Sequence, residues 1–146
     1  MSEQTIRFYF EDIENEVVNT PTHYKWLKNS LLRFNTQNYS INYIFCSDEY
    51  LLQVNKDYLD HDFYTDIITF NNSENKDFLE SDIFISVDRV CENAKENKVD
   101  FSCEVARVMI HGILHLVGFN DKTNEEQKLM TSMENENLSL HPELNC

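Results

Sequence analysis

The sequence predicts an α+β (mixed α/β) protein: a single layered domain in which a four-stranded sheet is packed by about five helices. Four short segments rich in β-branched and aromatic residues interleave with five segments of helical periodicity. Interleaving of this kind is typical of layered domains. The 146-residue chain contains no internal repeat and no Pro- or Ser-rich linker, so we expect one domain over residues 1–146.

Four segments are expected to form strands. Residues 5–10 alternate, with Ile6, Phe8 and Phe10 on one face, and residues 39–46 alternate in the same way. Residues 65–70 and 81–87 are rich in the β-branched and aromatic side chains that strands favour. The order of the strands in the sheet does not follow from these patterns.

Five segments are expected to form helices: residues 19–35, 47–59, 88–98, 102–118 and 123–136. Each has a start signal near its first residue. These signals are Thr20-Pro21, Ser47, either Ser86 or Asp88, Ser102, and a capping box of Thr123 with Glu126. Gly118 is expected to end the fourth helix.

Composition narrows the classes of partner. The chain has 26 acidic and 12 basic residues, a net charge of -14, which argues against non-specific binding to long nucleic acid and against DNA as a partner. It has no run of 18 apolar residues and no secretory signal, so we expect a cytoplasmic protein with no membrane contact. The cysteines form no CxxC pair and are expected to be free thiols: Cys46, Cys91, Cys103 and Cys146.

A metal-binding pattern lies in the fourth expected helix. His111 and His115 are four residues apart and share one face. A turn at Gly118 can then bring Asp121 back towards them. Two imidazoles and one carboxylate leave a coordination position open, as in catalytic zinc sites, although an anionic third ligand makes the ion a weaker acid. Gly112 inside the helix is expected to mark the close approach of another backbone element.

Three other interpretations of this pattern stay open. The two histidines could be core residues that hydrogen-bond to backbone carbonyls. A divergent metallopeptidase is less favoured, because Gly112 stands where zinc peptidases carry their glutamate base. Two histidines and a carboxylate also suit iron(II).

The same motif resembles the signature helix of the YbeY endoribonucleases of bacterial rRNA maturation. The matching residues are His111, Gly112, Leu114, His115, Leu116, Gly118 and Phe119. Upstream blocks are also similar to the family, at Asn55, Tyr58, Asp62, Thr65, Asp66, Thr69 and Phe70, at Asp82, Ile83, Ile85 and Ser86, and at Glu104. Three positions depart from it: Asp121 stands where the family usually has a third histidine, Leu59 where it commonly has Arg, and Ser81 where it has Gly.

The resemblance implies a function and a set of ligands. The expected activity is zinc-dependent hydrolysis of phosphodiester bonds in single-stranded RNA, in rRNA maturation and ribosome quality control. One zinc ion would be held by His111, His115 and Asp121, and the expected partners are rRNA and the ribosomal subunit or its assembly factors. Leu59 and the net charge somewhat favour an alternative, a metal-stabilised ribosome-assembly protein without catalysis.

The catalytic residues are not assigned, and the two candidates are Arg107 and Glu104. Both lie at helical spacing on the face of His111. Arg107 could hold a phosphate, although a solvent-facing or ion-paired Arg is the preferred interpretation. Glu104 could support the metal site or pair with Arg107.

Several other polar and aromatic residues receive structural interpretations. Thr65 and Thr69 are either cleft residues or ordinary strand residues, and Asp66 either caps or orients a neighbouring group. Surface positions are expected for His23 and His141, and for His61 an exposed loop position, with an approach to the metal site as the alternative. Core positions are expected for Tyr58, Phe63 and Tyr64, with stacking on unpaired bases as the alternative.

Overall fold

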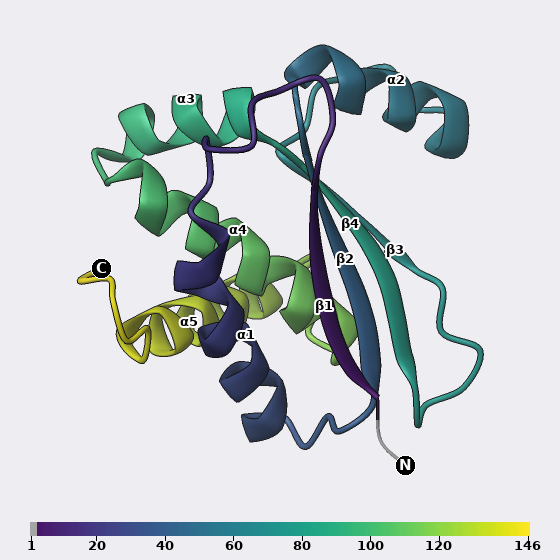
Figure 1. Ribbon diagram of the computed structural model, residues 1–146, viewed down its shortest axis with the longest axis vertical. Helices are drawn as coiled ribbons and strands as arrows, with labels where there is room; N and C mark the ends of the chain where they lie inside the picture. Colours follow the sequence, from purple (N-terminus) through teal and green to yellow (C-terminus); the bar gives the residue numbers. More distant parts are fainter. Residues whose placement is uncertain (1–2) are drawn as a thin grey trace.

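The structure is a computed structural model that describes residues 3–146, and over this range it contains four strands and five helices (Figure 1). In chain order they are β1 (Gln4–Phe10), α1 (Thr20–Arg33), β2 (Tyr39–Cys46), α2 (Asp48–Leu59), β3 (Ile67–Asn71), β4 (Leu79–Ser86), α3 (Val87–Asn97), α4 (Phe101–Leu116) and α5 (Asn124–Ser139). The predicted fold class is therefore confirmed.

The strands form one sheet in the order β1-β2-β4-β3. β1 pairs with β2, and β2 with β4, in parallel, whereas β3 runs antiparallel to β4. β2 is central, and its last four residues are all buried although the sequence alternates. β3 is left as an edge strand.

The helices cover both faces of the sheet unequally. α1, α4 and α5 lie on one side of the sheet, and α2 packs on the opposite face (Figure 1). The larger core lies between the sheet and α4, which is fixed by a 3.0 Å hydrogen bond from the Tyr43 hydroxyl to the Met109 carbonyl. A smaller core under α2 contains Leu51, Val54 and Ile68.

Of the four predicted N-terminal caps, those of α2, α3 and α5 are confirmed. The start of α1 at Thr20-Pro21 is confirmed as well. Ser47 accepts a hydrogen bond from the Tyr50 amide, Ser86 caps α3, and Thr123 forms its capping box with Glu126. The cap predicted at Ser102 is wrong, because α4 already begins at Phe101 and Asp100 is its N-cap residue.

The prediction of four free thiols is also wrong. Cys103 and Cys146 form a disulfide, whereas Cys46 and Cys91 are free. After α5 the chain turns back along the start of α4, which brings together two cysteines 43 residues apart. Their wide spacing gave no sign of this contact.

The prediction that His23 and His141 lie at the surface is wrong, because both are buried. His23 is 2% exposed and His141 is 5% exposed. Nδ1 of His23 lies 3.1 Å from Nε2 of His141, and Trp26 packs against the His141 ring. Burial, and then the neighbouring His141, lower the pKa of His23 to about 4. The contact pairs one nitrogen of each ring, and Nδ1 of His141 accepts from the Glu143 amide, so these bonds fix the segment after α5 against α1.

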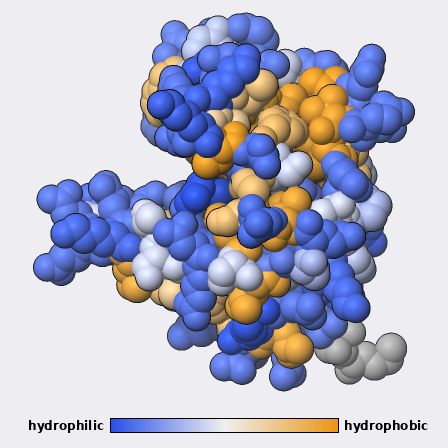
Figure 2. All heavy atoms as spheres, turned by 90° about the vertical axis from the view of Figure 1, so that its left-hand side faces the viewer, coloured by the Kyte–Doolittle hydropathy of each residue, from blue (hydrophilic) through white to orange (hydrophobic). Residues whose placement is uncertain are grey.

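The outer surface carries the acidic composition. Figure 2 shows a face that is mostly hydrophilic, with scattered hydrophobic areas and a hollow between its upper and lower parts. Over residues 3–146, no helix is both long enough and apolar enough to span a bilayer.

Candidate metal centre

The last two turns of α4 and the loop after it bring three donor groups together. His111 and His115 lie on one face of the helix, and their Nε2 atoms are 3.0 Å apart. Gly118 has a φ of +112°, a conformation that glycine adopts readily, and it reverses the chain there. Oδ2 of Asp121 consequently lies 3.5 Å from Nε2 of His111 and 3.3 Å from Nε2 of His115. We call these three residues the His–His–Asp group.

The spacing of these donor atoms suits a small cation. Ligand atoms ~2.0–2.2 Å from a tetrahedral ion lie roughly 3.3–3.6 Å apart. The three donor atoms are close to that range, and all lie within 4.8 Å of one another. Imidazole nitrogen and carboxylate oxygen are both common zinc ligands, so the donor set fits a single divalent ion with a position left for substrate or water.

A second carboxylate orients the first histidine. Glu134, in α5, accepts a 2.7 Å hydrogen bond from Nδ1 of His111 and a 2.9 Å hydrogen bond from Nη1 of Arg107. With its proton on Nδ1, His111 turns the lone pair of Nε2 towards His115 and Asp121. Partners of this kind fix the tautomer and orientation of metal-binding histidines.

The surrounding charges favour a cation at this point. Burial lowers the pKa of the His111 imidazole, but the hydrogen bond and negative charge of Glu134 raise it, as do Asp121 and Asp66. The net shift of the pKa is upward. Three carboxylates therefore outweigh the cost of burying a positive charge, and the same field stabilises a bound metal ion.

The two candidate catalytic residues lie behind the His–His–Asp group. Arg107 bonds Glu134, and its Nε lies 3.6 Å from Oε1 of Glu104. Glu104 is 4% exposed, and burial raises the pKa of its carboxyl while Arg107 partly opposes the shift. Arg107 is thus ion-paired, as its preferred interpretation expected, and it acts on His111 through Glu134.

Glu134 is the site residue that sequence reasoning missed. It lies within the helix predicted over residues 123–136, on the same face as the buried Met130 and Leu138. A carboxylate in the middle of an apolar helical stripe is costly to bury unless it has partners. That misplaced charge was the available signal.

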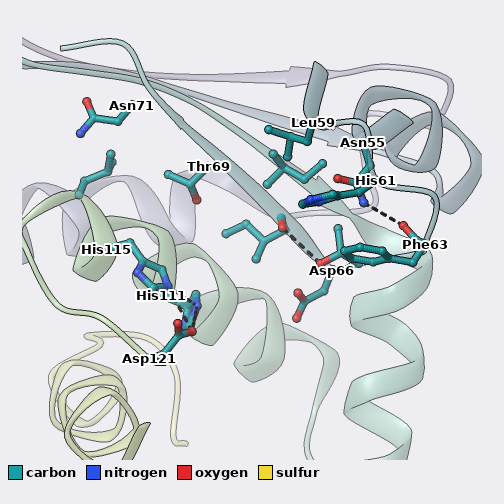
Figure 3. A pocket seen from close by; sticks show the side chains of 14 residues that line it. Asn55, Leu59, His61, Phe63, Asp66, Thr69, Asn71, His111, His115 and Asp121 are labelled. Carbon is teal, nitrogen blue, oxygen red and sulfur yellow. Dashed lines mark hydrogen bonds and ion pairs between the residues drawn. The ribbon is translucent and has the colours of Figure 1, made fainter. Parts of the chain in front are cut away.

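The His–His–Asp group opens into a cleft of about 580 Å³ (Figure 3). This volume is in the range of ligand pockets, ~300–1,000 Å³. Edge strand β3 and the loop before it form the opposite wall. The cleft is lined by Asn55, Leu59, His61, Phe63, Thr65, Asp66, Ile67, Ile68, Thr69, Asn71, His111, His115, Leu116 and Asp121.

The cleft includes residues whose role the sequence left open. Thr65, Thr69 and Asp66 all line it, and burial raises the pKa of the Asp66 carboxyl. His61 is exposed, as expected, but it also lines the cleft.

The prediction that three aromatic residues lie in the core is wrong. Tyr58, Phe63 and Tyr64 are 72%, 55% and 46% exposed, because the end of α2 and the following loop project past the sheet edge. Of the three, only Phe63 lines the cleft.

Gly112 marks a close approach, but of side chains and not of backbone as predicted. A Cβ atom at this position would lie 3.2 Å from Cδ1 of both Ile67 and Ile83, and 3.3 Å from Oγ1 of Thr69. The glycine thus lets α4 pack tightly on β3 and β4, which places His111 and His115 at the edge of the sheet. It faces the sheet and contributes no group to the cleft.

Comparison with known proteins agrees with this arrangement. The sequence model of the family described as endoribonuclease YbeY matches residues 9–141. The chain belongs to the YbeY family of endoribonucleases. The match includes every residue of the His–His–Asp group and Glu134.

Relatives extend the YbeY match over nearly the whole chain, and a solved structure shares its fold. An endoribonuclease YbeY of Cytophaga hutchinsonii is 48% identical over 96% of this chain and 98% of its own length. One of Flavobacterium psychrophilum is 44% identical over 92% of this chain and 95% of its own. The solution structure of TM1509 from Thermotoga maritima, at 23% identity, shares the fold with a TM-score of 0.64 over 92% of this chain and 87% of that one.

Proposed function

We propose that residues 1–146 form one metal-dependent hydrolase domain that cleaves phosphodiester bonds in single-stranded RNA. The main support is the His–His–Asp group, which lines the cleft and whose three donor atoms lie within 4.8 Å of one another. The chain that carries it is a member of an endoribonuclease family. We assign one Zn²⁺ ion as the cofactor, with His111, His115 and Asp121 as its ligands. A zinc ion bound there would polarise a phosphoryl oxygen and lower the pKa of water.

The residues of the chain have separable roles in this reaction. Glu134 holds the proton of His111 on Nδ1, and Arg107 neutralises the buried Glu134 charge. Thr65 and Thr69 line the cleft; the Thr65 hydroxyl donates to the Ile67 carbonyl at 3.4 Å, whereas the Thr69 hydroxyl can donate to a phosphate oxygen. Gly112 packs on the sheet and brings no acid or base, which weighs against peptide hydrolysis.

The proposed biological setting is rRNA maturation and ribosome quality control in the cytoplasm. The proposed partners are therefore rRNA and the ribosomal subunit or its assembly factors. Support for this setting comes from the family of the chain. Within a large folded RNA, unpaired segments are the expected substrate, because their bases and backbone are free to enter a cleft.

The test is cleavage of a single-stranded RNA by the purified zinc-loaded protein. His111→Ala and His115→Ala, purified in the same way to control for contaminating nucleases, should lose both the metal and the cleavage. Cleavage retained by both variants with no metal bound would refute the proposal. If removal of the metal lowers the melting temperature while the wild-type protein leaves RNA intact, the chain is instead a metal-stabilised assembly protein.

A further inference from the structure

The exposed loop after α2 holds two aromatic rings against each other on the wall of the cleft. The rings of His61 and Phe63 are stacked, with centroids 5.1 Å apart and planes 23° from parallel. Both rings line the same cleft as the His–His–Asp group, and Phe63 is 55% exposed. In Figure 3 they lie on one side of the cleft and the His–His–Asp group on the other, with Asp66 between. An apolar surface so open to solvent needs a reason.

The loop is held in place by a buried residue, so the position of the rings is built into the fold. Asn55 is 1% exposed, and its side-chain amide donates a 2.9 Å hydrogen bond to the Phe63 carbonyl. The backbone carbonyl of Asn55 accepts a 3.1 Å hydrogen bond from the His61 amide. Asp60, just before His61, adopts a left-handed conformation, with φ of 54°, which turns the chain sharply. Asn55 thus fixes the backbone on both sides of the stacked pair.

The charges of the cleft make ordinary phosphate binding weak. Most nucleic-acid affinity comes from Lys and Arg that neutralise phosphates. None of the described residues that line this cleft is Lys or Arg, whereas Asp66 and Asp121 are acidic. The neighbouring Lys56 lies 3.5 Å from a carboxylate oxygen of Asp62, and Leu59 is apolar. Apart from the metal ion proposed for the His–His–Asp group, the cleft offers no cation for phosphate, so we expect other contacts to contribute much of the affinity for RNA.

We propose that the stacked rings of His61 and Phe63 form a base-binding subsite, which holds one unpaired base of the RNA while the adjoining backbone reaches the His–His–Asp group. The proposal rests on the proposed function for the identity of the substrate. Stacking on aromatic rings accepts any base, because every base has a π-face, and it requires that the base be unpaired. The subsite therefore selects single strands without selecting a sequence.

Binding of a short fluorescein-labelled single-stranded RNA to the full chain, in EDTA so that no hydrolysis occurs, tests the subsite. Phe63→Ala should weaken binding about fivefold to 150-fold. Phe63→Leu keeps an apolar side chain without a ring and should weaken binding by a similar factor. Phe63→Trp keeps an aromatic ring and should bind about as well as wild type. Tyr9→Ala removes a comparably exposed ring, 44% exposed, from the opposite edge of the sheet and should bind like wild type. Thermal unfolding of each variant checks that it is folded.

An abasic nucleotide moved along the RNA identifies the stacked base. At one position it should weaken binding to the wild type about fivefold or more, and should change binding to Phe63→Ala less than twofold, because the two changes remove the same contact. The logarithm of the association constant should fall with the logarithm of salt concentration with a slope no steeper than about -1.4, the value for two neutralised phosphates. A steeper slope would overturn the argument from charge.

The outcomes separate this inference from the proposed function. Binding within twofold of wild type in Phe63→Ala overturns the subsite, even if the enzyme cleaves RNA. Ring-dependent binding by a wild-type protein that cleaves nothing with zinc supports the subsite and refutes the catalytic proposal. Cleavage with a raised KM and an unchanged kcat in Phe63→Ala supports both.

Discussion

Replacing Glu134 with Gln removes one negative charge beside the His–His–Asp group while it keeps the size of the side chain. The carboxylate accepts hydrogen bonds from both His111 and Arg107, at 2.7 and 2.9 Å. The two donors bond different carboxylate oxygens, and an amide in the same place has an NH₂ group at one of these two positions, so it can accept at only one of them. If the NH₂ faces Nδ1, His111 must carry its proton on Nε2, where the metal would bind.

The structure sets the size of the effect. Loss of a hydrogen-bonded partner behind a metal ligand typically costs 10–100-fold in metal affinity or activity. The Glu134 side chain is only 9% exposed, so water neither screens its charge nor replaces its hydrogen bonds. We therefore expect a loss of zinc affinity of roughly 10- to 100-fold, about 1.4–2.7 kcal/mol.

Competition with a chromophoric zinc chelator measures this loss directly. Glu136→Gln is the matched control, because Glu136 is on the same helix, is exposed, and makes the same change of charge. Zinc affinity within twofold of wild type in Glu134→Gln, or equal losses in the two variants, would refute the role assigned to Glu134.

Asp121→His exchanges an anionic donor for a neutral one, so the variant should keep zinc and its pH–rate profile should rise at lower pH; an unmoved profile would contradict Asp121 as a ligand. The pKa of His23 is about 4 when folded and 6.5 when unfolded, so the unfolded chain binds more protons between these values. The contribution of neutral His23 to the free energy of unfolding is complete above pH 6.5 and should fall by ~3 kcal/mol as the pH is lowered to 4. In urea titrations, His23→Asn should flatten this dependence of stability on pH. Cys103→Ser should cost about 4 kcal/mol in non-reducing buffer, and a reductant should destabilise wild type but not the variant.

The fold was largely predictable because local signals agreed along the chain. The alternation of residues 5–10 and the capping box at Thr123 each specify an element without reference to its neighbours. The N-cap residue of α4 is Asp100 and not Ser102, because both residue types are common at N-caps and local sequence places a helix start only to within one or two residues. The order of the strands depends on how the chain crosses over the sheet, which no local pattern records.

The site was predictable only where its residues are close in sequence. His111 and His115 are related by helical periodicity, and Asp121 follows a glycine turn, so one segment supplies the whole His–His–Asp group. The contact between Glu134 and His111 spans 23 residues and depends on how α5 packs on α4. The disulfide between Cys103 and Cys146 is likewise decided by tertiary packing.

The aromatic residues failed for a different reason. Tyr58 and Phe63 were assigned to the core because large apolar side chains are usually buried. The rule describes the average residue, and the loop after α2 instead exposes both rings to solvent. For Phe63, this exposure on the wall of the cleft is one of the observations behind the proposed base-binding subsite.

In the proposed function, one metal ion held by the His–His–Asp group drives cleavage of single-stranded RNA. Adding zinc back to metal-stripped protein, while cleavage of a single-stranded RNA is followed, tests this dependence. We predict no cleavage by the stripped protein and a rate that rises with zinc to a plateau at one equivalent per chain. Full cleavage by the stripped protein, or none at any zinc concentration, would contradict the claim.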